Sequence, residues 1–268
     1  MPEPITRQLT VYPPCPDLLP SGELREGRYE VRFACNMGEL DELLRLRFEI
    51  FNIELGEGLE SSYETGRDED EFDPVCHHLI VVERATGRII GTYRLQTSAM
   101  AEQNIGFYSD AEFDLGRFPP RVLADSVEVG RACIALEHRN TQVLFLLWKG
   151  LARYMAATGQ RYLFGCCSLT SQDPEEGWAV MALLQERGQI HPEVTTVPRA
   201  EYECRREPEA EPWPPGKVKI PKLFRIYLRH GALVCGPPAI DRRFKTIDFL
   251  VIFDVAAMDV RRFRTFFG

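Results

Sequence analysis

Hydrophobic residues recur at two spacings along this chain, and the alternation between the spacings predicts its elements. Between residues 40 and 51, leucine and phenylalanine return at steps of three and four, which predicts a helix with one apolar face. Shorter apolar runs have the length of buried strands. These runs are residues 29–34, 79–83, 88–95, 126–136, 162–168 and 247–255. Because strands and helices alternate, we expect an α/β fold, a mixed and twisted sheet with helices on both faces.

Turn and cap residues mark several element boundaries. Residues 85–87 (Ala-Thr-Gly) are typical of a hairpin between two strands. Asn140 is placed to cap a helix whose apolar stripe runs through residues 143–154. An Asp-Pro pair at 173–174 opens a further helix, and Pro221 begins a short last one.

The chain is predicted to form one domain. Its 268 residues, 44% of them hydrophobic, are enough for one sizeable core. Residues 1–28 are rich in proline and predict an extended arm, so the domain should cover 29–268. The charged, Pro-rich segment 204–219 predicts an exposed insertion within it. We expect neither a signal peptide nor a membrane span, because no basic start with an apolar run and no long apolar stretch is present.

Charge, cysteine usage and known motifs narrow the function classes. The net charge of −8 disfavours a general nucleic-acid binder. Eight cysteines without a CxxC pair favour reduced thiols and a cytoplasmic location. Residues 73–78 hold an aspartate, a cysteine and two histidines without a metal-ligand spacing, so we expect no metal and hydrogen-bonding roles for His77 and His78. A nucleophilic Cys133 would need a base, and the sequence shows none.

Arg47 is the first charged residue that packing alone does not explain. It falls on the apolar stripe of its predicted helix. A buried guanidinium must be paired, because leaving it alone costs several kcal/mol. Its charged end either reaches water at the edge of the core or joins an ionic network with the acidic loop that follows. Asp70, Glu71 and Asp73 are the candidate partners.

Glu128 is the second such residue. Strand alternation places it on one face with Gly130 and Ala132, whose small size leaves a hollow that could admit a substrate arm. Partial burial would raise the pKa of Glu128 toward a value useful for a general base. Gly130 also suggests a β-bulge, which would turn Arg131 towards Glu128. The alternative is a Glu–Arg pair that only ties strands together.

Arg94, within the apolar stretch 91–95, is the third charged residue that packing alone does not explain. Together with Arg47 and Arg131 and their acidic partners, it predicts a charged cluster in or beside a cleft. Such clusters are associated with functional sites.

Several short stretches, taken in order, resemble one known family. They are residues 46–51 (LRFEIF), 72–73 with 78–79, 91–95 (GTYRL), 112–114 (EFD), 128–131 (EVGR) with Cys133, 147–150 (LWKG), 165–166, 221–232 (PKLFRIYLRHGA), and Asp241 with Phe244 and Asp248. In this combination the chain resembles the ornithine-lipid type N-acyltransferases, often labelled hemolysin-like, over about residues 29–255. These are relatives of the long-chain N-acyl amino acid synthases and of the acyl-homoserine-lactone synthases.

The resemblance implies a GNAT fold and transfer of a long acyl chain, with or without a 3-hydroxyl group, to the α-amine of an amino acid. The implied donor is the phosphopantetheine thioester of acyl-carrier protein, with no permanently bound cofactor. The family's active-site carboxylate and ionic cluster would fall on Glu128, Arg131, Arg94, Arg47, and Asp70 or Asp73.

On this hypothesis Glu128 acts as the base, directly or through water, and the arginines orient the strand and the acceptor. Backbone N–H groups between Val129 and Cys133, freed where central strands separate, would hold the developing oxyanion.

Two features bear on the donor. Residues 137–142 (EHRNTQ) lack the glycine loop that holds coenzyme A in many GNAT acetyltransferases, which suits a carrier-protein donor. Because acyl-carrier proteins are acidic, an acidic enzyme needs a local basic dock. The candidate docking residues are Arg121, Arg139, Lys149 and Arg153, although an ordinary solvated helix face explains them equally well.

Two other functions share the fold. An acyl-homoserine-lactone synthase would use S-adenosylmethionine and favour an aromatic N-terminal pocket, and residues 52–63 hold few aromatics. A non-catalytic module that binds carrier protein or lipid is the other alternative. Residues 260–268 (VRRFRTFFG) suit either a peripheral membrane contact or buried packing.

Overall fold

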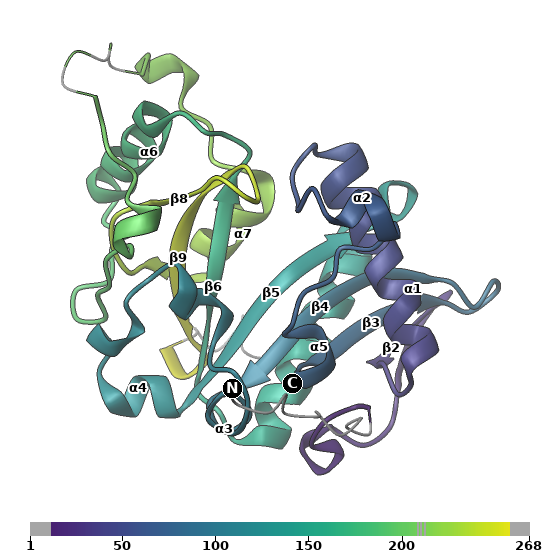
Figure 1. Ribbon diagram of the computed structural model, residues 1–268. Coiled ribbons are helices and arrows are strands. Elements are labelled where there is room, and N and C mark those ends of the chain that lie inside the picture. Colours follow the sequence, from purple (N-terminus) through teal and green to yellow (C-terminus); the bar gives the residue numbers. More distant parts are fainter. Residues whose placement is uncertain (1–11, 208, 210, 212, 258–268) are drawn as a thin grey trace, which may run out of the picture.

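The protein is built around one nine-stranded sheet (Figure 1). A computed structural model describes residues 12–207, 209, 211 and 213–257. The strand order is β1-β2-β3-β4-β5-β6-β9-β7, with β8 also paired to β9. The strands are β1 Leu24–Glu26, β2 Tyr29–Phe33, β3 His77–Glu83, β4 Ile89–Thr97, β5 Ser126–Ile134, β6 Tyr162–Leu169, β7 Leu233–Val234, β8 Ala239–Asp241 and β9 Thr246–Asp254.

Helices cover both faces of this sheet, as the hydrophobic pattern predicts (Figure 1). They are α1 Met37–Phe48, α2 Ser62–Thr65, α3 Ser98–Gln103, α4 Pro120–Ala124, α5 Thr141–Thr158, α6 Pro174–Glu186 and α7 Lys222–His230. The predicted caps are confirmed: the Asn140 side chain accepts from the Val143 N–H at 3.0 Å, and Asp173 accepts from the Glu175 N–H at 2.9 Å. The mixed α/β fold is therefore confirmed.

The core falls into separate clusters that follow the sheet. Leucines of α1 and α5 pack with β2, β3 and β4 in the first cluster. The second joins α6 and α7 to one face of β6 and β9, and the third covers their other face with the loop around Phe113 and Leu115. The sheet thus has a β2–β5 half and a β6–β9 half, each with its own packing.

The two halves of the sheet are joined over a very short length. β5 and β6 are parallel and pair only between Ser126–Glu128 and Tyr162–Phe164. Beyond that point β5 continues along β4 as far as Ile134, whereas β6 continues along β9 as far as Leu169. A gap therefore opens in the middle of the sheet, beginning beside Glu128.

The N-terminal arm is more structured than its composition predicts. Residues 24–26 form β1, which pairs antiparallel with β2, so this part of the expected arm lies against the sheet. Ahead of it, Tyr12 is buried and the Pro14 carbonyl accepts a hydrogen bond from the His77 ring. Residues 1–11 lie outside the described part of the chain.

The predicted insertion is anchored at its start and exposed beyond it. The Cys204 carbonyl accepts from Trp178 Nε1 at 2.7 Å, and Arg206 forms a two-point ion pair with Glu175 of α6. Residues 205–207 are exposed. Among the helices that the structure describes, none is long and apolar enough to cross a bilayer.

Gly165 should be essential to the junction between β5 and β6. A Cβ at this position would lie 2.1 Å from the Val129 carbonyl oxygen, closer than two such atoms can approach. We expect G165A to lower the free energy of unfolding by about 3 kcal/mol or more. Gly130 is the matched control, because a Cβ there meets nothing within 4 Å and its φ is not positive. Chemical denaturation of G165A and G130A would contradict this account if both lost equal stability.

Candidate active site

A buried ionic network flanks the gap on its β4–β5 side. Arg47 is 0% exposed, and its Nε donates to Asp68 at 2.7 Å while its Nη1 donates to Asp73 at 2.6 Å. Arg94 donates to Asp70 at 2.6 Å and to Asp73 at 3.1 Å. The network reading of Arg47 is therefore confirmed, and the reading in which its charged end reaches water is wrong.

The acidic loop is organised by its own side chains as well as by the arginines. Asp73 accepts from the Asp70 N–H, and Asp70 accepts from the Phe72 N–H. Burial alone would raise the pKa of Asp73, but Arg47 and Arg94 outweigh it and hold this pKa well below its ordinary value. Asp73 thus stays ionised at any physiological pH.

The third arginine reaches this network only because β5 is bulged. The β4–β5 register shifts between Thr92 and Arg94, opposite residues 130–133. Arg131 has φ 50°, a left-handed conformation that is unfavourable for an arginine. The bulge turns its side chain to the face that carries Glu128, where it contacts Asp70 at 3.1 Å and Asp68 at 3.4 Å. The predicted β-bulge is confirmed, and the residue with the strained backbone conformation is Arg131.

Aromatic rings hold the Arg131 guanidinium from two sides. Its central carbon lies 4.7 Å from the ring centroid of Tyr108 and 4.2 Å from that of Phe244. Such cation–π contacts are stronger when water is excluded. The guanidinium is thus fixed in position, with the side chain 10% exposed.

Glu128 lies at the point where the gap begins. Its carboxylate accepts from the backbone N–H groups of Tyr108 at 2.8 Å and Ser109 at 2.7 Å. Burial raises its pKa, although the two N–H groups and Arg94 partly oppose that rise. The side chain is 7% exposed and each carboxylate oxygen retains a lone pair for a further partner.

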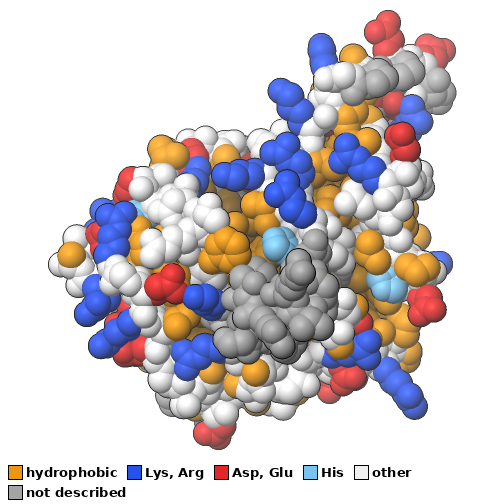
Figure 2. All heavy atoms as spheres, turned by 180° about the vertical axis from the view of Figure 1, so that it is seen from behind, with side chains coloured by type: hydrophobic (Ala, Val, Ile, Leu, Met, Phe, Trp, Pro, Cys, Tyr) orange, Lys and Arg blue, Asp and Glu red, His pale blue; other side chains and the backbone are white. Residues whose placement is uncertain are grey.

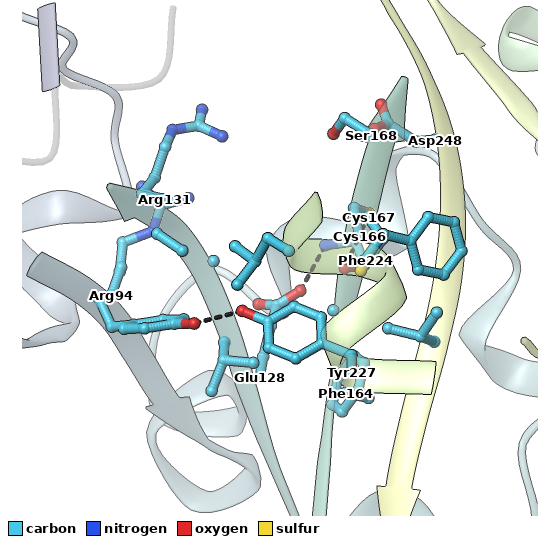
Figure 3. Close-up of a pocket in the computed structure, with 18 of the residues that line it drawn as sticks. Arg94, Glu128, Arg131, Phe164, Cys166, Cys167, Ser168, Phe224, Tyr227 and Asp248 are labelled. Carbon is cyan, nitrogen blue, oxygen red and sulfur yellow. Dashed lines mark hydrogen bonds between the residues drawn. The ribbon is translucent and has the colours of Figure 1, made fainter. Parts of the chain in front are cut away.

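A cavity of about 400 Å³ occupies the gap and reaches both faces of the sheet. Alternate residues of β6 point to opposite faces, yet Leu163 and Cys167 line it as well as Phe164 and Cys166. Figure 3 shows the Glu128 carboxylate within it, with Arg94 and Arg131 on one side and Ser168 and Asp248 on the other. The cavity volume is in the range of small-molecule sites.

Comparison with known proteins shows the family of this chain. Residues 46–149 match the family model of the acetyltransferase (GNAT) domain. The chain is 33% identical over 245 residues to L-ornithine N(alpha)-acyltransferase of Rhodobacter capsulatus, covering 86% of this chain and 91% of that protein. The enzyme of the same name from Rhizobium meliloti is 30% identical over 249 residues, covering 88% and 83%. The chain belongs to the L-ornithine N(alpha)-acyltransferase family.

The chain is therefore an N-acyltransferase with a GNAT fold, and the predicted family is confirmed. Among solved structures it is similar to FeeM, an N-acyl amino acid synthase from uncultured soil microbes, at 12% identity and a TM-score of 0.47 over 86% of this chain and 94% of that one. It is also similar to the acyl-homoserine lactone synthase LasI, at 11% identity and a TM-score of 0.45 over 85% and 91%.

In this acyltransferase the other predicted residues take different positions. Val129 lines the cavity, whereas Cys133 does not and is packed in the first core cluster. Burial raises the pKa of the Cys133 thiol to about 12. Glu71 is exposed, and no ion pair joins it to the network among the described residues. Both are set apart from the cavity.

The two histidines are hydrogen-bonded within the core, as expected. His77 pairs with the Tyr154 hydroxyl at 2.8 Å, and His78 with the Asp73 carbonyl at 3.0 Å. Burial lowers the pKa of each to about 4, so both are neutral at pH 7.

Sequence reasoning did not single out several residues that the fold brings to the site. Asp68 was not distinguishable from the other acids of its loop. Tyr108 and Ser109 supply the backbone groups that hold Glu128, a role without a side-chain signal. Glu112, Asp241 and Asp248 also line the cavity; they were named from the sequence only within the stretches that carry the family resemblance and were given no role. The charged strand residue Asp248 interrupts an apolar run, which is the same signal that marked Arg47.

Replacement of a buried arginine of the network should lower the free energy of unfolding more than replacement of an exposed arginine on the same helix. R47M removes the fully buried cation that Asp68 and Asp73 share and leaves them only the longer ion pairs with Arg131 and Arg94, so we expect a loss of about 3–5 kcal/mol in the free energy of unfolding. The control is R45M on the same helix, whose exposed pair with Asp41 should be worth less than about 1 kcal/mol. Denaturant titration measures both, and equal losses would argue against a structural network.

Proposed function

We propose that this enzyme transfers a long acyl chain from the phosphopantetheine thioester of acyl-carrier protein to the α-amine of ornithine. The observation that carries the proposal is the cavity through the sheet, with a buried carboxylate where β5 and β6 part. The names of its relatives support ornithine as the acceptor. The chemical differences between the two sides of the cavity support separate entry of donor and acceptor.

The donor is proposed to occupy the side that faces α5 and α7. The lining there is apolar and aromatic, as a pantetheine arm and a fatty chain require. Trp148 stacks on Tyr227 with ring centroids 5.8 Å apart, and the Tyr227 hydroxyl is hydrogen-bonded to that of Tyr93. The other residues on this side include Leu151, Ala152, Phe224 and Phe253.

The reaction needs one proton removed and one thiol released. The acceptor ammonium first gives a proton to Glu128, directly or through a water molecule. The free amine then attacks the thioester carbonyl and the C–S bond breaks. The nitrogen loses its second proton as the amide forms, and the departing pantetheine thiolate takes up that proton to become the thiol. Proton removal of this kind contributes about 10²- to 10⁴-fold in rate.

The strand that borders the gap supplies the remaining groups of this mechanism. Backbone N–H groups between Val129 and Cys133 are proposed to stabilise the oxyanion. Arg131 is proposed to bind the acceptor carboxylate, since this residue lines the cavity and its guanidinium is held between two rings. Arg47, Arg94, Asp70 and Asp73 hold Arg131 and β5 in place as positioning residues.

The carrier-protein dock is proposed to lie on α7 rather than on the four residues expected from sequence. Arg139 pairs with Glu54, Lys149 with Glu26, and Arg153 donates to the Ser21 carbonyl, so each has a partner on its own chain. Arg121 is exposed on α4. Three of the four are thus poor candidates for a free anion-binding surface.

α7 has cations on one side and cavity-lining residues on the other. Lys222, Arg225 and Arg229 follow at steps of three and four, are exposed, and form no ion pair with any other described residue. Phe224 and Tyr227 of the same helix line the cavity. Seen from behind, Lys and Arg side chains gather beside a hydrophobic area (Figure 2). An acidic carrier docked there would have its thioester arm beside the donor entrance.

The proposed reaction takes place in the cytoplasm, where carrier-protein thioesters are made. The peripheral membrane contact considered for residues 260–268 falls outside the described residues.

Loss of the Glu128 carboxylate should remove the base. E128Q is expected to lower kcat by about 10²- to 10⁴-fold for ornithine with acyl-carrier protein as donor. In the wild type, kcat/KM should fall as the pH drops through the raised pKa of Glu128, because a protonated carboxyl cannot accept a proton. E128Q should lack this acid limb, which a merely structural loss would leave in place. Unchanged turnover in folded E128Q would remove Glu128 as the base.

Charge reversal on α7 should affect the carrier protein and spare small donors. K222E/R225E/R229E is expected to raise KM for acyl-carrier protein at least about tenfold, with kcat for an acyl-pantetheine donor unchanged. R84E/R88E, on the β3–β4 hairpin, is the control and should behave as wild type. Steady-state kinetics with both donors test this, and an equal KM for carrier protein in both variants would place the dock elsewhere.

A further inference from the structure

Three carboxylates from distant parts of the chain meet on the β6–β9 side of the cavity. Glu112, Asp241 and Asp248 are buried, line the cavity, and have carboxylate oxygens within 4.8 Å of one another. Glu112 follows the short helical turn Tyr108–Ala111, Asp241 ends β8, and Asp248 lies in β9 opposite Ser168. We call these residues the acidic triad.

Asp248, which lines the cavity, has one carboxylate oxygen that is buried without a hydrogen-bond partner among the described residues. Asp248 is 4% exposed, its Oδ2 accepts from the Thr246 hydroxyl at 2.9 Å, and its Oδ1 has no hydrogen bond among the described residues. Asp241 is satisfied at Oδ1 by the N–H groups of Arg243 and Phe244. A buried carboxylate oxygen without a donor is costly unless a ligand supplies one.

The triad also lacks the counter-charge that the opposite side of the cavity has. There, Arg47, Arg94 and Arg131 balance Asp68, Asp70 and Asp73. No cation forms an ion pair with the triad within the described part of the chain, and Arg131 only partly opposes the rise in the pKa of Glu112 and Asp248. Burial, followed by mutual repulsion, raises the pKa of Glu112 well above its ordinary value, and burial raises that of Asp248 to about 6. A cation bound among the three carboxyl groups would offset their mutual repulsion and favour their ionised forms.

Side-chain contacts connect the triad to Glu128. Along β6 and β9, Phe164, Cys166 and Asp248 share the sheet face of Glu128. The Cys166 thiol lies 3.9 Å from Glu112 and 3.6 Å from the Ser109 hydroxyl, and the Ser109 N–H donates to Glu128. An acceptor with its amine at Glu128 would thus extend a short side chain towards the triad.

We propose that the acidic triad binds the side-chain ammonium of a diamino-acid acceptor and thereby selects it over neutral amino acids. This inference rests on the proposed function, and it assigns the specificity of that reaction to Glu112, Asp241 and Asp248. The acceptor is held at three points: its carboxylate at Arg131, its α-amine at Glu128, and its distal ammonium at the triad.

The chemistry of the proposed reaction favours an ammonium over a metal ion. An ammonium offers three N–H donors to oxygens about 2.8 Å away, and the carboxylate oxygens of the triad, all within 4.8 Å of one another, can accept them. The thioester chemistry needs no Lewis acid, because Glu128 and the backbone supply the proton transfer and the oxyanion contacts. A divalent cation held by the same oxygens is an outcome that the experiment must exclude.

The test compares L-ornithine with L-norvaline, which has the same carbon skeleton without the distal amine. Wild type, D248N and E112Q are assayed with long-chain acyl-carrier protein, and products are identified by mass spectrometry. We expect wild type to prefer ornithine by about 10²-fold or more in kcat/KM, because a charged site left unpaired rejects the neutral analogue. D248N and E112Q should lower kcat/KM for ornithine by about 10- to 100-fold and that for norvaline by less than threefold.

Controls separate binding from folding. D248N keeps an oxygen for the Thr246 hydroxyl and removes repulsion within the triad, so its thermal midpoint at pH 7.5 should equal or exceed that of wild type. E186Q, which removes one negative charge from the exposed end of α6, should leave both substrates unaffected.

Several outcomes would overturn the inference. Equal losses for ornithine and norvaline in both triad variants would indicate a structural role. Equal use of both amino acids by wild type would remove the specificity while leaving the acyltransferase function intact. Loss of wild-type activity in EDTA, restored by Mg²⁺ or Mn²⁺, would make the triad a metal site. If wild type acylates no amino acid, the proposed function fails and this inference fails with it.

Discussion

The separation of β5 from β6 after three paired residues is the constraint on which the site depends. A continuous sheet would fill the middle of the domain with backbone hydrogen bonds and leave no room for a substrate arm. Here each strand is held by its other neighbour, β5 by β4 and β6 by β9. The unpaired edges are sustained because each half of the sheet has its own core.

The buried ions make the β4–β5 half rigid at the point where a strand is least supported. Arg131 is in a strained backbone conformation, and such strain persists only where the surroundings fix it. Two aspartates and two aromatic rings do so here. Arg47 is too deep to touch a substrate, yet it holds the aspartates that hold Arg131. Its presence in an apolar stripe is explained by this indirect role.

Much of this fold followed from local patterns. The strands with long apolar runs, the caps at Asn140 and Asp173, and the bulge at Gly130 depend on neighbouring residues, which a sequence displays directly. The strands β1, β7 and β8 were not predicted, since two or three residues carry no period and pair only after the rest of the sheet forms.

Only part of the candidate site could be predicted, again because a sequence displays local patterns and not the contacts between distant residues. Arg47, Arg94 and Glu128 could be predicted from the sequence because each is a charged residue within an apolar run. A charge in such a run must be buried, and its burial requires a partner or a function. The pairing of surface cations was not predictable: Arg139 meets Glu54, which lies 85 residues away, and only the folded chain brings them together. Asp68 is one of four consecutive acids, and its sequence neighbours gave no reason to choose it.

A cavity that passes through a sheet also determines how a product can leave. In the proposed arrangement, donor and acceptor enter from opposite faces, so the finished amide would be threaded, its fatty tail on the α7 side and its charged head on the other. The fatty tail could not pass to the other face without crossing the charged side of the cavity, and the charged head could not pass without crossing the apolar side. Since β5 and β6 separate beyond Glu128 (Figure 1), a threaded product would leave sideways through the open end of the gap, which keeps each end of the molecule in its own surroundings.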